Sequence, residues 1–340
     1  MKNEIIAYVG SGVFTEEDAK KLTAINFAFG HLHNDGTVTC EGCCKEKLEM
    51  IPQIRAWNPE LRILLSMVQP ERDAFTRCCA DPALRAKAAA SLAETAKQYD
   101  LDGIDLDWEY PCVPSNNSVV SRDDKHNFTL FCAEIRKQLD TLDGRRRWLT
   151  IAAGADLYYV NCVELPALMD SLDYINVMTY DLKCGFHALA GHHTALFSNV
   201  GDVFRNSCAQ ALALFVEYGV PADRLIMGAA FYSRKWEGLN DNENHGLLEI
   251  CKTGGGYGPD YTQLKESYIG KNGYTEYWDD EAAAPYLFNG STFLSYDNPR
   301  SLRAKVAHVQ EKGYGGVFYW EHKCDETREL LDTLVEATKG

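Results

Sequence analysis

The segment Leu101-Asp102-Gly103-Ile104-Asp105-Leu106-Asp107-Trp108-Glu109-Tyr110-Pro111 places four carboxylates within a short apolar run. Side chains of a β-strand alternate between its two faces, and residues two apart lie about 6.6 Å apart on one face. This alternation puts Asp105, Asp107 and Glu109 in one row, with Ile104 and Leu106 on the opposite face. We interpret the segment as a strand with one acidic face and one apolar face.

A row of like charges is unfavourable unless some of its members are protonated or hydrogen-bonded. A solvated edge strand is the alternative, but edge strands favour lysine and mixed polar residues, and the opposite face of this segment is apolar. Neighbouring carboxylates in different environments have different pKa values, so one of them can donate a proton near neutral pH. The row therefore predicts acid–base catalysis.

Short apolar segments rich in Ile, Val, Phe and Ala recur along the chain and alternate with helical patterns, which is typical of βα units around a parallel sheet. Eight such segments favour an α/β fold of the (β/α)8 TIM barrel type over an open sheet, which usually has fewer strands. The expected strands cover residues 5–9, 24–29, 62–66, 103–107, 149–154, 174–178, 225–230 and 316–320.

The expected helices cover residues 15–21, 45–57, 81–99, 123–142, 208–218 and 301–313. Asp81 followed by Pro82 is typical of a helix N-cap and first turn. Thr15 and Asp18 have the spacing of a capping box. On the acidic strand, Asp102 and Trp108 have the parity of the apolar face. We therefore expect Asp102 to be structural and Trp108 to pack between the barrel and its helices.

The stretch between the seventh and eighth strands is about 80 residues long, roughly twice the length of a βα unit. It contains a turn-rich patch at 253–259, where we interpret the glycines as a flexible turn, and alternating apolar segments at 274–278, 284–288 and 292–295. This pattern predicts a small antiparallel insert. We expect a single catalytic domain over residues 1–340, with an α+β insertion at 235–292.

The formal net charge of −15 argues against nucleic acid or an anionic membrane as a partner, because both require a basic surface. It favours a neutral or cationic ligand. No apolar run reaches membrane-spanning length, and the N-terminus has no export signal. We expect a monomeric cytoplasmic protein, or a secreted one if a signal peptide has been removed.

The twelve cysteines are scattered in a chain long enough to build a core without disulfides, so free thiols are expected. Cys40, Cys43 and Cys44 lie near His31 and His33, but their spacing matches no zinc-binding pattern. His187, His192 and His193 have no acidic partner at helical spacing, and we place them on a polar rim near the substrate. No metal or cofactor is expected.

Active sites of TIM barrels lie at the C-terminal ends of the strands. Aromatic and acidic residues dominate these ends, and phosphate-binding residues are missing. Rings that stack on sugar faces, with carboxylates between them, are what a glycosidase cleft requires. The residues at the strand ends are Tyr8, Phe29, Asp107, Glu109, Met178, Tyr180, Asp181, Tyr232, Arg234 and Trp320.

The run DGIDLDWE at 102–109 resembles the DxxDxDxE motif of glycoside hydrolase family 18 chitinases. Further runs are similar to family motifs, in the same order along the chain: Ala28-Phe29-Gly30, Met178-Thr179-Tyr180-Asp181, Tyr232 with Arg234, and Gly315-Gly316 leading to Trp320. The insertion resembles the α+β insertion of many members. One departure is Met67-Val68-Gln69-Pro70, which follows Ser66 where the family commonly has a glycine-rich motif.

The resemblance implies substrate-assisted hydrolysis, in which the 2-acetamido group of the sugar is the nucleophile. Glu109 would protonate the leaving oxygen and then activate water. Asp107 would hold the acetamido N–H, Asp105 would share a proton with Asp107, and Tyr180 would position the acetamido oxygen. Each of these roles is carried over from the family motif.

The resemblance also implies a sugar-binding set. Asp181, Tyr232 and Arg234 would grip the distorted sugar and Trp320 would be its stacking floor, with Tyr8, Phe29 and Met178 as further substrate-binding residues. The expected activity is retaining hydrolysis of β-1,4-linked N-acetylglucosamine in chitin or its oligosaccharides. The alternatives are an endo-β-N-acetylglucosaminidase acting on N-glycan or peptidoglycan, a non-catalytic chitin-binding lectin, and a metal-dependent hydrolase that uses the aspartates as ligands.

Overall fold

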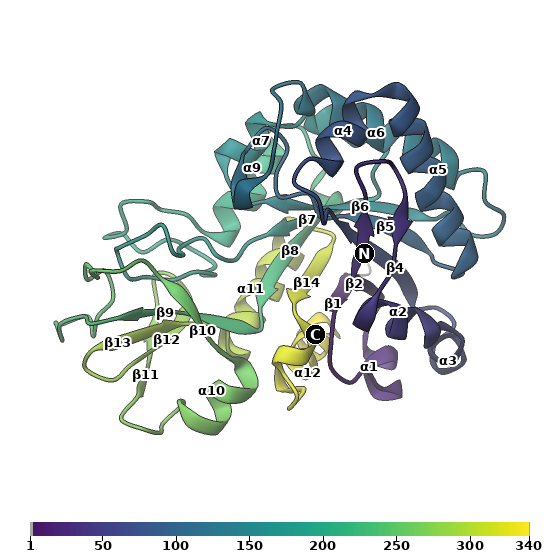
Figure 1. The fold of residues 1–340 in the computed structure, drawn as a ribbon. Helices are drawn as coiled ribbons and strands as arrows, with labels where there is room; N and C mark the ends of the chain where they lie inside the picture. Colours follow the sequence, from purple (N-terminus) through teal and green to yellow (C-terminus); the bar gives the residue numbers. More distant parts are fainter. Residues whose placement is uncertain (1–2, 340) are drawn as a thin grey trace.

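Eight parallel strands form a closed barrel in a computed structural model that describes residues 3–339 (Figure 1). β1 pairs with both β2 and β14, which closes the ring. The barrel strands, in their order around the ring, are β1 (Glu4–Val9), β2 (Ala24–Leu32), β4 (Arg62–Val68), β5 (Gly103–Leu106), β6 (Trp148–Gly154), β7 (Tyr174–Met178), β8 (Leu225–Ala230) and β14 (Gly316–Trp320). The predicted TIM barrel is confirmed.

Helices cover the outside of this ring (Figure 1). They are α1 (Glu16–Lys21), α2 (Gly42–Glu49), α3 (Ile51–Trp57), α4 (Ala74–Ala80), α5 (Pro82–Gln98), α6 (Asp124–Leu139), α7 (Leu157–Asn161), α8 (Leu165–Leu168), α9 (Cys208–Glu217), α11 (Pro299–Lys312) and α12 (Glu329–Lys339). The predicted capping box of Thr15 and Asp18 and the N-cap at Asp81 are confirmed. The single helix expected at 45–57 is wrong: α2 ends at Glu49, Met50 caps both helices, and α3 begins at Ile51 with a proline in its first turn.

The insertion forms a five-stranded antiparallel sheet beside the barrel (Figure 1). Its strands, in sheet order, are β10 (Gly256–Asp260), β9 (Tyr232–Glu237), β13 (Thr292–Ser295), β12 (Ala284–Phe288) and β11 (Thr275–Asp279), with α10 (Tyr261–Ser267) after β10. It has a small core of its own, in which Trp236, Tyr286 and Phe293 pack together. The first strand of this sheet, β9, follows the barrel strand β8 after one residue.

The glycines at 254–256, expected as a flexible turn, have a packing role. A Cβ on Gly254 would lie 1.9 Å from the carbonyl oxygen of Gly185, and one on Gly255 would lie 2.3 Å from the ring of Trp236. Gly256 already belongs to β10 and pairs with Lys235. The glycines let the insertion pack directly against the loop that follows β7.

The apolar face of β5 packs as the alternation predicted. Ile104 and Leu106 are fully buried, and Trp108 stacks on Phe75 with ring centroids 5.2 Å apart. Asp102 is also buried, and its carboxylate accepts hydrogen bonds from Arg55 and from the backbone N–H of Ile63. The structural roles expected for Trp108 and Asp102 are confirmed.

The twelve cysteines are all free thiols in the described part of the chain. His33, which lies near the cysteine cluster in the sequence, has both ring nitrogens occupied by other partners: Nδ1 lies 2.8 Å from Glu71 and Nε2 lies 2.8 Å from Thr39. Within residues 3–339, none of the helices combines the length and the apolar character needed to cross a lipid bilayer.

Candidate active site

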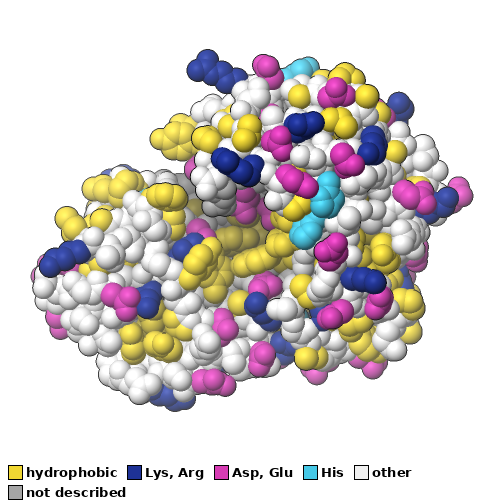
Figure 2. All heavy atoms as spheres, viewed as in Figure 1, with side chains coloured by type: hydrophobic (Ala, Val, Ile, Leu, Met, Phe, Trp, Pro, Cys, Tyr) yellow, Lys and Arg dark blue, Asp and Glu magenta, His cyan; other side chains and the backbone are white. Residues whose placement is uncertain are grey.

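A hollow separates the insertion from the barrel on the face shown in Figure 2, with hydrophobic and acidic side chains at its base. A cavity of about 230 Å³ opens next to Asp107 and Glu109. Its other wall is the loop that follows β4, together with Ser118. The lining residues there are Val68, at the end of β4, and Gln69, Pro70, Glu71 and Arg72 of the loop.

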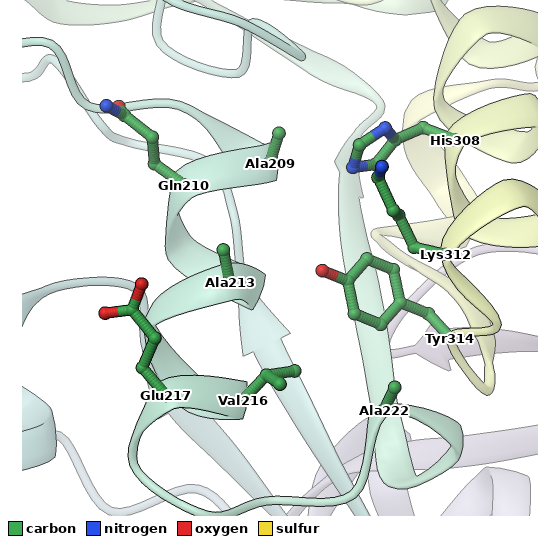
Figure 3. A pocket seen from close by; sticks show the side chains of 9 residues that line it. All are labelled: Ala209, Gln210, Ala213, Val216, Glu217, Ala222, His308, Lys312 and Tyr314. Atoms are coloured by element: carbon green, nitrogen blue, oxygen red, sulfur yellow. The ribbon is translucent and has the colours of Figure 1, made fainter.

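A larger cavity, of about 550 Å³, lies between α9 and α11 on the outside of the barrel. Figure 3 shows Gln210 and Glu217 on one side of it and His308 and Lys312 on the other. Its lining contains none of the residues that the strand ends predicted. The smaller cavity is therefore the one associated with the acidic strand, although it has less than half the volume.

Asp105 lies at the bottom of the acidic row and is fully buried. Its Oδ2 accepts hydrogen bonds from Tyr8 at 2.9 Å and Ser66 at 2.7 Å, and its Oδ1 accepts from Thr150 at 2.6 Å and Asn176 at 3.2 Å. Burial raises the pKa of Asp105, while these four hydrogen bonds lower it. The four hydrogen bonds lower that pKa less than burial raises it, so the pKa of Asp105 lies above its usual range.

Asp107, one step closer to the mouth, has the opposite environment. Its Oδ1 is buried and has no hydrogen-bond partner among residues 3–339. Burial raises the pKa of Asp107 well above its usual range, and the negative charges of Glu109 and Asp105 raise it further. No direct hydrogen bond joins Asp105 to Asp107 in the described residues, so the influence of Asp105 on this proton is Coulombic.

Glu109 is the most accessible carboxyl of the row and lies beyond the end of β5. The walls of the cleft remove enough water from it to raise its pKa; a hydrogen bond with Tyr110 lowers that pKa, and the charge of Asp181 raises it again. A raised pKa keeps a glutamic acid protonated closer to neutral pH, which is the property of a general acid.

Asp181 follows β7 and is held by two residues of β9. The Tyr232 hydroxyl donates to its Oδ1 at 2.7 Å, and Arg234 donates through Nε to Oδ1 at 2.6 Å and through a terminal nitrogen to Oδ2. Burial raises the pKa of Asp181, but the neighbouring His193 and the hydrogen bonds from Arg234 outweigh it and hold the pKa below its usual range. Asp181 is thus a fixed negative charge near Glu109.

Aromatic side chains form the opposite side of the site, across the barrel from β5. Trp320 stacks on Phe29 with centroids 5.5 Å apart and lies 5.8 Å from Tyr8. Met178 and Tyr180 pack into the same cluster. The structure thus brings together the residues that the strand ends predicted, with carboxylates on one side and partly exposed rings on the other.

Several residues near the site were missed by the sequence analysis. Ser66 and Thr150 flank Asp105 in register on β4 and β6, and Asn176 reaches it from β7. Their signal is a polar residue inside an otherwise apolar strand. Tyr257, which lies under Arg234 with the guanidinium carbon 3.6 Å from the ring centroid, gave no such signal.

The prediction that His187, His192 and His193 form a polar rim is wrong for two of the three residues. His192 and His193 are buried, because the insertion covers the loop that carries them. His192 Nε2 lies 3.1 Å from Asp279 of the insertion, and His193 lies against Asp181 and Tyr232. Phe186, next to His187 in the same loop, is 97% exposed.

Comparisons with known proteins agree with this geometry. The profile of glycosyl hydrolases family 18 matches residues 4–325. Chitinase A1 of Niallia circulans is 34% identical over 307 residues, which cover 84% of this chain and 44% of that protein, so the chain spans less than half the length of this relative.

Two solved structures are also similar. A family 18 N-acetylglucosaminidase from Paenibacillus barengoltzii has a TM-score of 0.94 and 42% identity, over 98% of this chain and 99% of that one. Chitinase ChiA74 from Bacillus thuringiensis has a TM-score of 0.91 and 28% identity, over 100% and 70% of the two chains. The chain belongs to glycosyl hydrolases family 18.

Proposed function

We propose that the protein hydrolyses glycosidic bonds next to N-acetylglucosamine, with the 2-acetamido group of the sugar as nucleophile. The observation that carries the proposal is the contrast between Asp107 and Glu109. Asp107 has a buried oxygen without a hydrogen-bond partner in the part of the chain that the structure describes, and this oxygen is suited to a polar group of the substrate. Glu109 is accessible and has a raised pKa, suited to protonating the leaving oxygen.

The favoured substrate is chitin or a chitooligosaccharide. Neutral sugars suit a cleft in a protein of net charge −15, and the partly exposed rings of Trp320 and Phe29 offer a stacking surface. Chitinases from several organisms are among the similar proteins. Glu109 is present, which favours a catalytic protein over a lectin.

Release of single N-acetylglucosamine units is a second candidate. The cavity beside Glu109 is small, about 230 Å³, and the similar Paenibacillus protein is an N-acetylglucosaminidase. A restricted space on one side of the cleavage point would limit the length of the sugar chain bound there.

The product pattern from chitohexaose distinguishes these candidates. Early formation of dimers to tetramers would indicate a chitinase, whereas monomer released from the first time point would indicate an N-acetylglucosaminidase. Parallel assays with muropeptides and a high-mannose glycoprotein test the peptidoglycan and N-glycan alternatives. Loss of activity with a chelator would contradict the metal-independent mechanism, and binding without any product would indicate a lectin.

A further inference from the structure

His193 lies directly behind Asp181, in the loop that follows β7. Its backbone is fixed on both sides: the N–H donates to Ser295 Oγ of β13 at 2.9 Å, and the carbonyl accepts the N–H of Leu182 at 3.0 Å. Its side chain has no exposed surface, and its ring centroid is 5.2 Å from that of Tyr232. The imidazole is therefore a fixed wall of the Asp181 site.

Nδ1 of this imidazole accepts a hydrogen bond from the backbone N–H of Asp181 at 3.4 Å. Asp181 has φ of 55°, in the left-handed region that residues other than glycine rarely adopt. Such conformations persist where the surrounding structure enforces them, and they are frequent at functional sites. His193 thus binds the backbone N–H of Asp181, while Tyr232 and Arg234 bind the carboxylate of the same residue.

The charge state of His193 determines whether it can accept this bond. Burial lowers its pKa, the carboxylates of Asp181 and Asp297 raise it, and Arg234 lowers it again; the net direction is downward. A neutral imidazole with Nδ1 as acceptor carries its proton on Nε2. Nε2 is buried and has no hydrogen-bond partner among the described residues. Nδ1 also lies 3.5 Å from Oδ1 of Asp181, so the backbone N–H and the carboxylate of Asp181 compete for this one nitrogen.

We propose that His193 is a positioning residue, whose neutral imidazole accepts the backbone N–H of Asp181 and so holds the Asp181 carboxylate against Tyr232 and Arg234. Its kinetic consequences rest on the proposed glycosidase function, whereas its hydrogen bond does not. Asp181 is also the charge that faces Glu109. Displacing Asp181 therefore weakens sugar binding and changes the environment of the acid.

The kinetic experiment compares three variants on a chromogenic chitobioside. His193→Leu removes the acceptor and should lower kcat/KM roughly tenfold, the effect of one lost hydrogen bond. His193→Asn places an amide oxygen near the position of Nδ1 and should recover activity to within about threefold of wild type. Both variants lose the imidazole, so the difference in kcat/KM between them reports the effect of the hydrogen-bond acceptor.

His192→Asn is the matched control. His192 is the adjacent buried histidine, and it bonds to Asp279 instead of Asp181. This variant should lower the Tm about as much as His193→Leu while leaving kcat/KM within about twofold of wild type. Equal loss of kcat/KM in His192→Asn and His193→Leu, or wild-type kcat/KM in His193→Leu, would overturn the proposal.

A second measurement does not depend on activity. Nitrogen NMR of the histidine rings, with the His193 signal assigned by its absence in His193→Asn, should show the proton on Nε2 and an unprotonated, hydrogen-bonded Nδ1 near pH 7. A proton on Nδ1 would contradict the proposal. A wild type that fails to hydrolyse chitohexaose would refute the proposed function, and the tautomer would still decide the bond between His193 and Asp181.

Discussion

Asp105 and Asp107 lie two residues apart on the same face of the acidic segment, yet one carboxyl accepts four hydrogen bonds and the other has an oxygen with no partner in the described structure. The two side chains share a chemistry but not an environment. Asp105 stabilises the centre of the barrel, whereas Asp107 is left with capacity to bind a further group. Substitution by asparagine should separate these two roles.

Asp105→Asn should lower the free energy of unfolding by about 1–3 kcal/mol. The amide NH2 of asparagine would face hydrogen-bond donors in place of the carboxyl oxygen that accepts from them. Asp107→Asn should change stability by less than about 1 kcal/mol and lower kcat at least roughly a hundredfold. Urea unfolding and kcat on a chromogenic chitobioside measure both effects. Normal activity in Asp107→Asn would argue against assistance by the acetamido group.

Glu109→Gln should lower kcat by roughly 10² to 10⁴, the range for a lost general acid, while the protein still binds chitotetraose. The amide cannot donate a catalytic proton, but it keeps the shape of the side chain. Calorimetric binding and product release measure the two properties. Release of most of the wild-type product by this variant would show that another residue is the acid.

The pH profile should respond to Asp181. A general acid is active while protonated, so the raised pKa of Glu109 extends activity to higher pH, and activity falls as pH rises through that pKa. Asp181→Asn removes one cause of the raised pKa, so the alkaline limb of kcat/KM should move to lower pH. An unmoved limb would mean that Asp181 does not influence Glu109. Asp279→Asn, a change to a carboxylate of the insertion that bonds His192, is the control.

Lys305 and Asp297 form a fully buried ion pair with an N–O distance of 2.6 Å. Asp297→Ala should lower the free energy of unfolding by about 3–5 kcal/mol, because it leaves a buried ammonium without its charge partner. Asp280→Ala, at the exposed pair with Arg300, should cost less than about 1 kcal/mol. Urea unfolding of both variants tests the contrast. Equal losses would mean that the buried charge finds another partner.

The barrel strands were predictable because each is an apolar segment between polar helical patterns, and the strands at 174–178, 225–230 and 316–320 have the predicted bounds. β9 was missed because it follows β8 after one residue, so no turn residue marks where the chain leaves the barrel. The helix α12 was also missed, although Leu330, Leu331 and Leu334 have helical spacing and are buried.

The site was predictable as far as strand ends and motifs reach. Glu109, Asp107 and Trp320 each lie in or directly after a strand whose position the apolar pattern shows. The hydrogen-bond partners of Asp105 were not predictable, because Ser66 and Thr150 contact it through the register of neighbouring strands. A sequence does not state that register. The prediction that His193 is exposed on a polar rim was wrong for a similar reason. Its burial depends on how the insertion covers the loop after β7, which the sequence does not state.

Tyr232, Arg234 and Trp236 alternate with their neighbours along β9 and therefore share one face of that strand. Trp236 Nε1 bonds to the carbonyl of His187, in the same loop after β7 that carries Asp181, and Trp236 also packs in the core of the insertion. The insertion and that loop thus form one interlocked part. In a chimaera of two family members, transplanting the insertion without the loop after β7 would separate Arg234 from the Asp181 carboxylate that it binds. The insertion and this loop are therefore the smallest unit that can be exchanged together.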